Sequence, residues 1–140
     1  MPQDAHFIAT KTVGSEVFVF DWRKFPSEPT NSVCTPTLRL TGHSKEGFGL
    51  AWNPNKQGQL LSASDDHLVC MWNIEAARES SLDANTVFHG HSDVVEEVDW
   101  HKHHECLFGS VGDDRKVEEE KTEHFFSPLP PPPLIFSLSL

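Results

Sequence analysis

The hydrophobic pattern between positions 42 and 89 is that of short β-strands. Apolar residues alternate with glycine and alanine over Phe48–Trp52, and near-continuous apolar runs cover Leu60–Ser64 and Leu68–Trp72. A period of two and short apolar runs are typical of strands buried on one or both faces. Turn-forming residues separate the three segments, and no helical period extends across them. We expect residues 42–89 to form one antiparallel four-stranded sheet, with Thr86–His89 as its last strand.

The landmarks of this unit return along the chain, each 48 residues later. The positions related in this way are Gly42 and Gly90, His43 and His91, Trp52 and Trp100, and Asp66 and Asp114. A period in the forties that starts with Gly-His and ends near a Trp and a small amide residue, here Trp72-Asn73, is typical of a four-stranded propeller blade.

The chain is therefore predicted to be all-β, with about two to three blades of a β-propeller within residues 1–117. Residues 7–21 align with the complete unit as a degenerate earlier blade that lacks its first strand, and Thr37–Leu40 is expected to be the last strand of that blade. Val94–Trp100 opens the following blade. Because a closed propeller needs ~4–8 blades, we expect this chain to be a fragment of a larger propeller.

Polar residues at fixed places in each unit are expected to form a buried hydrogen-bond network. Imidazole, hydroxyl, carboxylate and indole N–H groups can satisfy one another, and buried polar groups need such partners. The predicted network residues are His43, Ser62, Asp66 and Trp72 in the complete blade and His91, Ser110 and Asp114 in the next. A Ser, a His and an Asp also suggest a hydrolase triad, but no Gly-x-Ser-x-Gly elbow accompanies them. We predict a structural network and no catalytic residue.

Charge and composition limit the partners. The chain holds 21 acidic and 11 basic residues, and its formal net charge of −10 argues against direct binding to nucleic acid and favours basic partners. No apolar segment approaches the ~18 residues that would cross a membrane, and the opening residues do not form a signal peptide. Three cysteines are too few for a disulfide framework and favour a reducing compartment.

The histidines raise an alternative from another class of function. Candidate ligands for zinc or another transition metal are His89, His91, His101, His103, His104, Glu105 and Cys106. Neighbouring residues on a strand point to opposite faces, and no Cys-x-x-Cys pair occurs. We therefore expect no metal site and no cofactor, and keep a His-rich metal-binding protein as an alternative.

The last part of the chain breaks the repeat. The charged run Val117–His124 stands where a strand of the last blade is expected, and unpaired carboxylates in a low-dielectric core cost free energy. It is followed by five prolines in the six positions from Pro128 to Pro133, which favour an extended polyproline II conformation. We expect residues 118–140 to be a disordered, Pro-rich tail. Whether this tail is a ligand for Pro-binding modules or an altered reading of the gene stays open at this point.

Several segments resemble the nuclear histone-binding WD-repeat proteins, the retinoblastoma-binding proteins that serve as the small subunit of chromatin assembly factor. The segments are LRLTGHSKEGFGLAWNPN from Leu38, LLSASDDHLVCMWNI from Leu60, VVEEVDWH from Val94 and LFGSVGDD from Leu107. The resemblance, which covers roughly three quarters of the chain, implies part of a seven-bladed propeller in the nucleus that binds histones and subunits of chromatin complexes without catalysis.

The resemblance also implies a peptide-binding site on the top face of the propeller. Its acidic and aromatic positions fall on Glu46, Phe48 and Glu96 in this sequence, and the family usually has a tyrosine where Phe48 stands. Phe48 and Glu96 are 48 residues apart and so occupy equivalent places in neighbouring blades. The expected function is a non-catalytic scaffold that recognises basic histone-type peptides; the alternative is a truncated product that does not fold alone.

Overall fold

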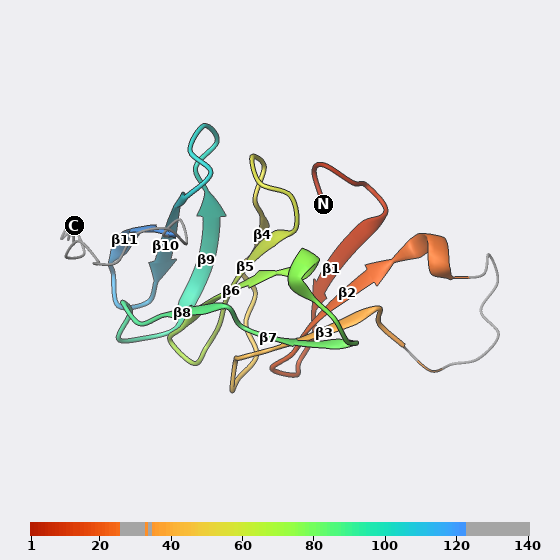
Figure 1. Ribbon diagram of the computed structural model, residues 1–140. Coiled ribbons are helices and arrows are strands. Elements are labelled where there is room, and N and C mark those ends of the chain that lie inside the picture. The colour runs from red at the N-terminus through yellow and green to blue at the C-terminus, as the bar shows by residue number, and fades with distance from the viewer. Residues whose placement is uncertain (26–32, 34, 123–140) are drawn as a thin grey trace.

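A computed structural model describes residues 1–25, 33 and 35–122 of the chain. It consists of three β-sheets side by side (Figure 1). The first sheet contains β1 (Phe7–Lys11), β2 (Val17–Asp21), β3 (Leu38–Thr41) and β7 (Ser81–Asp83). The second contains β4 (Leu50–Trp52), β5 (Gln59–Ala63), β6 (Val69–Asn73) and β8 (Thr86–Phe88), and the third contains β9 (Val95–Trp100), β10 (Leu107–Gly112) and β11 (Val117–Lys121).

The second sheet is the complete four-stranded unit that the sequence predicts. Its strands pair in the order β4-β5-β6-β8, and every pair is antiparallel. Leu60 pairs with Trp72, and Ser62 pairs with Cys70. The turn between β5 and β6 places His67 at a φ of 71°, in the left-handed region. The prediction of an all-β chain built from propeller-type blades is confirmed.

The second sheet buries both of its faces, because a neighbouring sheet covers each one. The face towards the first sheet belongs to a core cluster formed by Val17, Val19, Leu38, Leu40, Leu60, Cys70, Trp72 and Ile74. The face towards the third sheet belongs to a cluster formed by Leu61, Ala63, Val69, Met71, Val95, Val98, Trp100 and Phe108. Successive residues on a strand point to opposite faces, so the two leucines of Leu60-Leu61 serve different clusters.

The first sheet contains a strand that the sequence did not indicate. After β6 the chain forms a short 3-10 turn, η2 (Ile74–Ala76), and then returns to the first sheet as β7, parallel to β3. Arg39 N–H donates to Ser80 O at 2.8 Å, and Ala84 N–H donates to Thr41 O at 3.0 Å. A second 3-10 turn, η1 (Trp22–Lys24), follows β2. Neither helical turn in the described part of the chain is long or apolar enough to span a membrane.

The third sheet corrects the predicted end of the ordered region. Val117–Lys121 forms β11, which pairs along its length with β10, so the boundary expected at residue 117 is wrong. Glu118 and Glu120 are only partly buried, because β11 is an edge strand and their carboxylates are not sealed in a core. Burial, followed by the nearby charge of Glu118, raises the pKa of Glu120 to about 6. The rest of the predicted tail, 123–140, lies outside the described residues.

Candidate functional site

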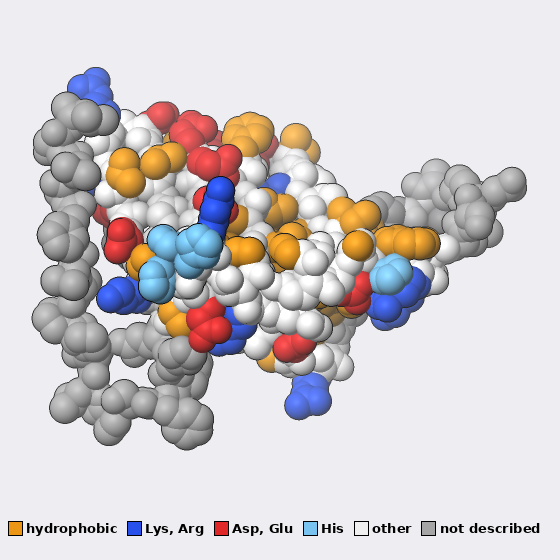
Figure 2. Space-filling model, turned by 90° about the horizontal axis from the view of Figure 1, so that it is seen from above, with side chains coloured by type: hydrophobic (Ala, Val, Ile, Leu, Met, Phe, Trp, Pro, Cys, Tyr) orange, Lys and Arg blue, Asp and Glu red, His pale blue; other side chains and the backbone are white. Residues whose placement is uncertain are grey.

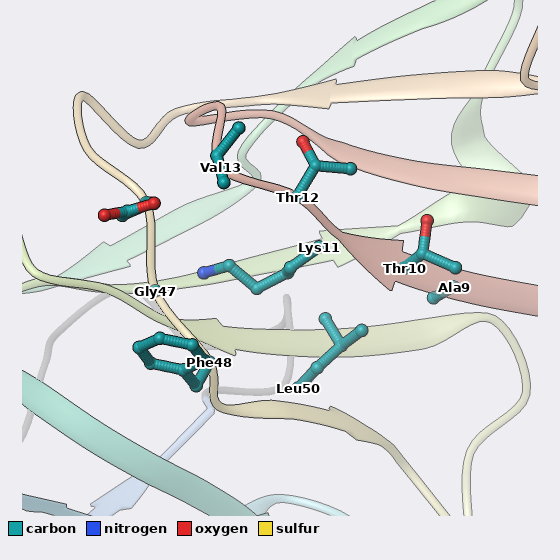
Figure 3. A pocket seen from close by; sticks show the side chains of 9 residues that line it. Ala9, Thr10, Lys11, Thr12, Val13, Gly47, Phe48 and Leu50 are labelled. Carbon is teal, nitrogen blue, oxygen red and sulfur yellow. The ribbon is translucent and has the colours of Figure 1, made fainter. Parts of the chain in front are cut away.

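An open pocket of about 520 Å³ lies between the end of β1 and the segment that leads into β4 (Figure 3). Its lining residues are Ala9, Thr10, Lys11, Thr12, Val13, Glu46, Gly47, Phe48 and Leu50. Two of the three residues predicted to contact a peptide, Glu46 and Phe48, therefore meet in one place.

Phe48 is presented to solvent by the backbone around it. Its side chain is 78% exposed. A Cβ atom on Gly47 would lie 2.5 Å from the Ala63 carbonyl oxygen, so the backbone at this point runs directly against the end of β5. The Ser64 hydroxyl donates to Glu46 O at 2.6 Å, and Asp65 N–H donates to the same oxygen at 2.9 Å. These contacts fix the segment and leave the ring free to meet a ligand.

Glu96, the third predicted contact residue, lies on β9 of the next sheet and is exposed. It is not among the residues that line the pocket. β4 and β9 are nonetheless adjacent: a Cβ atom on Gly49 would be 3.1 Å from Glu97 Cα, and Trp100 Nε1 donates to Ala51 O at 3.1 Å. The structure places Glu96 on the neighbouring blade, at a position equivalent to that of Phe48.

Lys11 is a pocket residue that the sequence interpretation missed. Its Nζ points from β1 towards the second sheet (Figure 3) and donates to Ser62 Oγ at 2.7 Å and to Ala63 O at 2.5 Å. Burial lowers the pKa of Lys11 to about 8, although nearby Asp66 favours the charged form. The repeat marks Lys11 only as an unusual residue: it stands 52 residues before Ala63, where the complete blade has a small apolar side chain, and the repeat does not identify the partners of its ammonium group.

The predicted network of the second blade continues from Lys11. His43 Nε2 lies 3.1 Å from Ser62 Oγ, and His43 Nδ1 lies 3.1 Å from Asp66 Oδ2. Burial, together with the charge of Lys11, lowers the pKa of His43. A neutral imidazole fits the partners if Nδ1–H donates to Asp66 and Nε2 accepts the Ser62 hydroxyl. Ser62 is fully buried, and this arrangement stabilises the blade instead of presenting a nucleophile.

Trp72 does not take the place that was predicted for it in this chain of hydrogen bonds. Its indole N–H donates to the carbonyl of Thr41 at 3.0 Å, and its ring packs edge-on against His43 with 5.9 Å between the centroids. Trp72 thus links the blade to the end of β3 in the first sheet and supports the imidazole by packing.

The next blade repeats the network, but Ala63 of the preceding sheet stands in the place of Lys11, and the nearby cation is Lys116 of the same blade, whose Nζ lies 3.8 Å from Asp114 Oδ2. His91 Nε2 lies 2.9 Å from Ser110 Oγ, and His91 Nδ1 lies 3.0 Å from Asp114 Oδ1. Burial alone would raise the pKa of Asp114, but hydrogen bonds from Ser92 N–H, His91 and Lys116 N–H lower this pKa to about 2. The same three residue types therefore meet in both blades, 48 residues apart.

The candidate metal ligands do not converge. The His101 and His104 rings lie tilted against each other in the β9–β10 turn, with 4.6 Å between their centroids, and the His103 ring centroid lies 6.1 Å from that of His101. Figure 2 shows a group of His side chains on the face seen from above. Within residues 1–25, 33 and 35–122, no group of three or more His, Cys, Asp or Glu side chains is arranged to hold a metal ion.

Comparison with known families agrees with this geometry. The family described as "WD domain, G-beta repeat" matches residues 34–73 and 83–118, together more than half of the chain. The two matches cover the His-Ser-Asp networks and the strands of the second and third sheets, except for the part of β11 beyond residue 118. Proteins built from this repeat are protein-interaction scaffolds, generally without catalysis. The blades, their repeated networks and these two matches show that the chain belongs to the WD-repeat family.

Proposed function

We propose that this WD-repeat chain is a histone-binding scaffold subunit that recognises basic peptides through Glu46, Phe48 and Glu96. The observation that carries the proposal is the 78% exposure of Phe48 beside the exposed carboxylate of Glu46 in an open pocket. A lysine or arginine side chain is attracted both to the face of an aromatic ring and to a neighbouring carboxylate.

Lys11 shares the pocket but does not neutralise Glu46. Its ammonium is turned inward to Ser62 and Ala63, and no ion pair involving Glu46 forms among the described residues. The Glu46 carboxylate is therefore available to a ligand. The net charge of −10 further attracts a basic peptide over a longer range.

Glu96 extends the same chemistry to the next blade. A peptide that runs from the start of β4 to the start of β9 meets Phe48 on one blade and Glu96 on the following one. The proposed setting is the nucleus, within complexes that assemble, deacetylate or remodel chromatin, where histone tails supply such peptides.

The test is binding of a fluorescently labelled histone-tail peptide to the 140-residue chain, measured by anisotropy. Glu46→Gln, Phe48→Ala and Glu96→Gln are each expected to weaken binding roughly fivefold, the equivalent of about 1 kcal/mol for an exposed cation contact. Glu79→Gln, which removes an exposed carboxylate from the link before β7, is the matched control and should leave affinity unchanged.

Two further measurements separate specific recognition from general attraction. Affinity should fall as salt is raised, because screening weakens contacts between exposed charges. Acetylation of the peptide lysines should abolish binding by removing their charge. Equal affinity of the control and the three pocket variants, or binding that is indifferent to acetylation, would contradict the proposed function.

A further inference from the structure

Each of the two end sheets has one face that no other sheet covers within the described part of the chain. On the first sheet this face contains Ile8, Phe18 and Phe20, since the alternate residues Val17 and Val19 point into the core. Ile8 is 49% exposed, and the Phe18 and Phe20 rings pack edge to face at 6.5 Å.

The repeat shows what kind of surface covers such a face. Ile8, Phe18 and Phe20 stand 52 residues before Leu60, Cys70 and Trp72. These later residues are fully buried, because the first sheet packs on them. The outer face of the first sheet is thus equivalent to the face of the second sheet that receives a preceding blade.

The third sheet ends in the complementary kind of face. Val111, Val117 and Glu119 stand 48 residues after Ala63, Val69 and Met71, which pack on the third sheet. Val111 and Val117 pair with each other and are 40% and 46% exposed. The third sheet therefore presents the surface with which a blade normally meets the next blade.

Charge and shape also favour contact between these two faces. The third-sheet face carries the carboxylates of Glu97 and Glu119, whereas the first-sheet face carries the Arg39 guanidinium, 4.9 Å from the centroid of the Phe18 ring and paired with the exposed Glu16 carboxylate at 3.2 Å. Glu97 takes the place of Gly49, which must be small because β9 lies against it. Among the described residues, the first sheet begins with β1 and has no strand equivalent to β4 or β9 next to it. A first sheet docked on the third sheet therefore leaves room for the Glu97 side chain.

We propose that the outer face of the third sheet of one copy docks on the outer face of the first sheet of a second copy. Both sheet-to-sheet contacts among the described residues join these same two kinds of face, and the described part of the chain carries one of each that no sheet covers. The interface is heterologous, so repeated contacts give a ring if the rotation closes and an open chain if it does not. This proposal concerns a different surface from the peptide pocket and does not depend on it.

The experiment is a mass measurement by sedimentation velocity on the full chain over a wide range of concentration. The unaltered chain should form species of two or more copies. Ile8→Asp should block the first-sheet face, and Val117→Asp should block the third-sheet face, so each variant alone should be monomeric. His103→Asp places a carboxylate in the exposed β9–β10 turn, away from both faces, and should associate like the unaltered chain.

Mixing the two monomeric variants decides the orientation of the contact. Each variant retains the face that the other has lost, so an equal mixture should give a complex of two copies. Such a complex also shows that both variants are folded; if Ile8→Asp fails to unfold cooperatively, Ile8→Ser is used in its place. An unaltered chain that stays monomeric, whether its faces remain bare or residues 123–140 cover one of them, would overturn the proposal. Self-association that survives either variant, or folded variants that do not combine, would also overturn it.

Discussion

Replacing Lys11 with Met removes a buried ammonium group from the contact between the first two sheets. Lys11 donates to Ser62 Oγ and Ala63 O, but burial lowers its pKa from the ordinary 10.5 to about 8. The folded protein therefore releases a proton that the unfolded chain retains between about pH 8 and pH 10.5. Stability rises with pH wherever the unfolded chain binds more protons. The destabilising effect of the Lys11 charge is fully present below pH 8 and disappears as the pH approaches 10.5.

The magnitude follows from the size of the shift. One pKa unit corresponds to about 1.4 kcal/mol, so a change from 10.5 to about 8 corresponds to about 3 kcal/mol. The amine lines an open pocket, and partial exposure to solvent screens its charge. We expect the pH-dependent part of the effect to be about 1–2 kcal/mol in the free energy of unfolding.

Urea unfolding followed by tryptophan fluorescence measures this effect at about pH 7.5 and about pH 10. The stability of Lys11→Met relative to the unaltered chain should be about 1–2 kcal/mol more favourable at the lower pH. Cys70, whose pKa is raised to about 12 by burial, is present in both proteins and cancels in the difference. Lys11→Arg keeps its charge at both pH values and serves as the matched control. A stability difference between Lys11→Met and the unaltered chain that does not change with pH would refute the reasoning.

Three other substitutions test the blade itself. His43→Ala leaves the buried Ser62 and Asp66 side chains without the imidazole and should lower the free energy of unfolding, measured in urea, by about 1–3 kcal/mol. The same change at an exposed histidine of the β9–β10 turn should lower it by less than about 0.5 kcal/mol. Gly49→Ala would place a Cβ 2.8 Å from Ala63 Cβ and should lower the thermal midpoint by overpacking; an unchanged midpoint would show that β4 can move away. Glu120→Gln should be more stable than the unaltered chain above pH 6 and should lose this advantage towards pH 4.5. The reason is that folding raises the pKa of Glu120 to about 6, so the unaltered chain loses stability as this group ionises. Equal thermal midpoints of the variant and the unaltered chain at both pH values would contradict this prediction.

The second sheet could be predicted in detail because its central strands carry apolar residues on both faces. The runs containing Leu60 and Met71 are apolar at successive positions, and this matches a sheet with a neighbour on each side. The His43 network could be predicted because its residues recur at a fixed spacing. Two of the expected peptide contacts, Glu46 and Phe48, meet in one pocket, whereas their ligand stays a proposal.

The two missed strands have a common physical cause. Ser81–Asp83 and Val117–Lys121 lie at the edges of sheets, where one neighbouring strand satisfies part of the backbone and the side chains remain near solvent. Edge strands therefore do not need the apolar pattern that marks central strands. Glu118 and Glu120 lie beside Ser110 and Phe108 on the covered face of the third sheet, but β11 is its edge strand, so the two carboxylates stay half-buried and need not be excluded from a strand.

Lys11 could not be assigned from the sequence because periodicity gives the face of a side chain but not the atoms that the next sheet places opposite it. In the second sheet the equivalent position is Ala63, which contributes only an apolar contact to the third sheet. In the first sheet the same position meets the Ser62 hydroxyl. The second blade consequently has a cation at the end of its His-Ser-Asp network, and the network around His91 has no matching lysine from the preceding blade. The pKa of His43 is thus lowered by burial and by a charge that belongs to the sheet before its own, and the repeat does not show that charge.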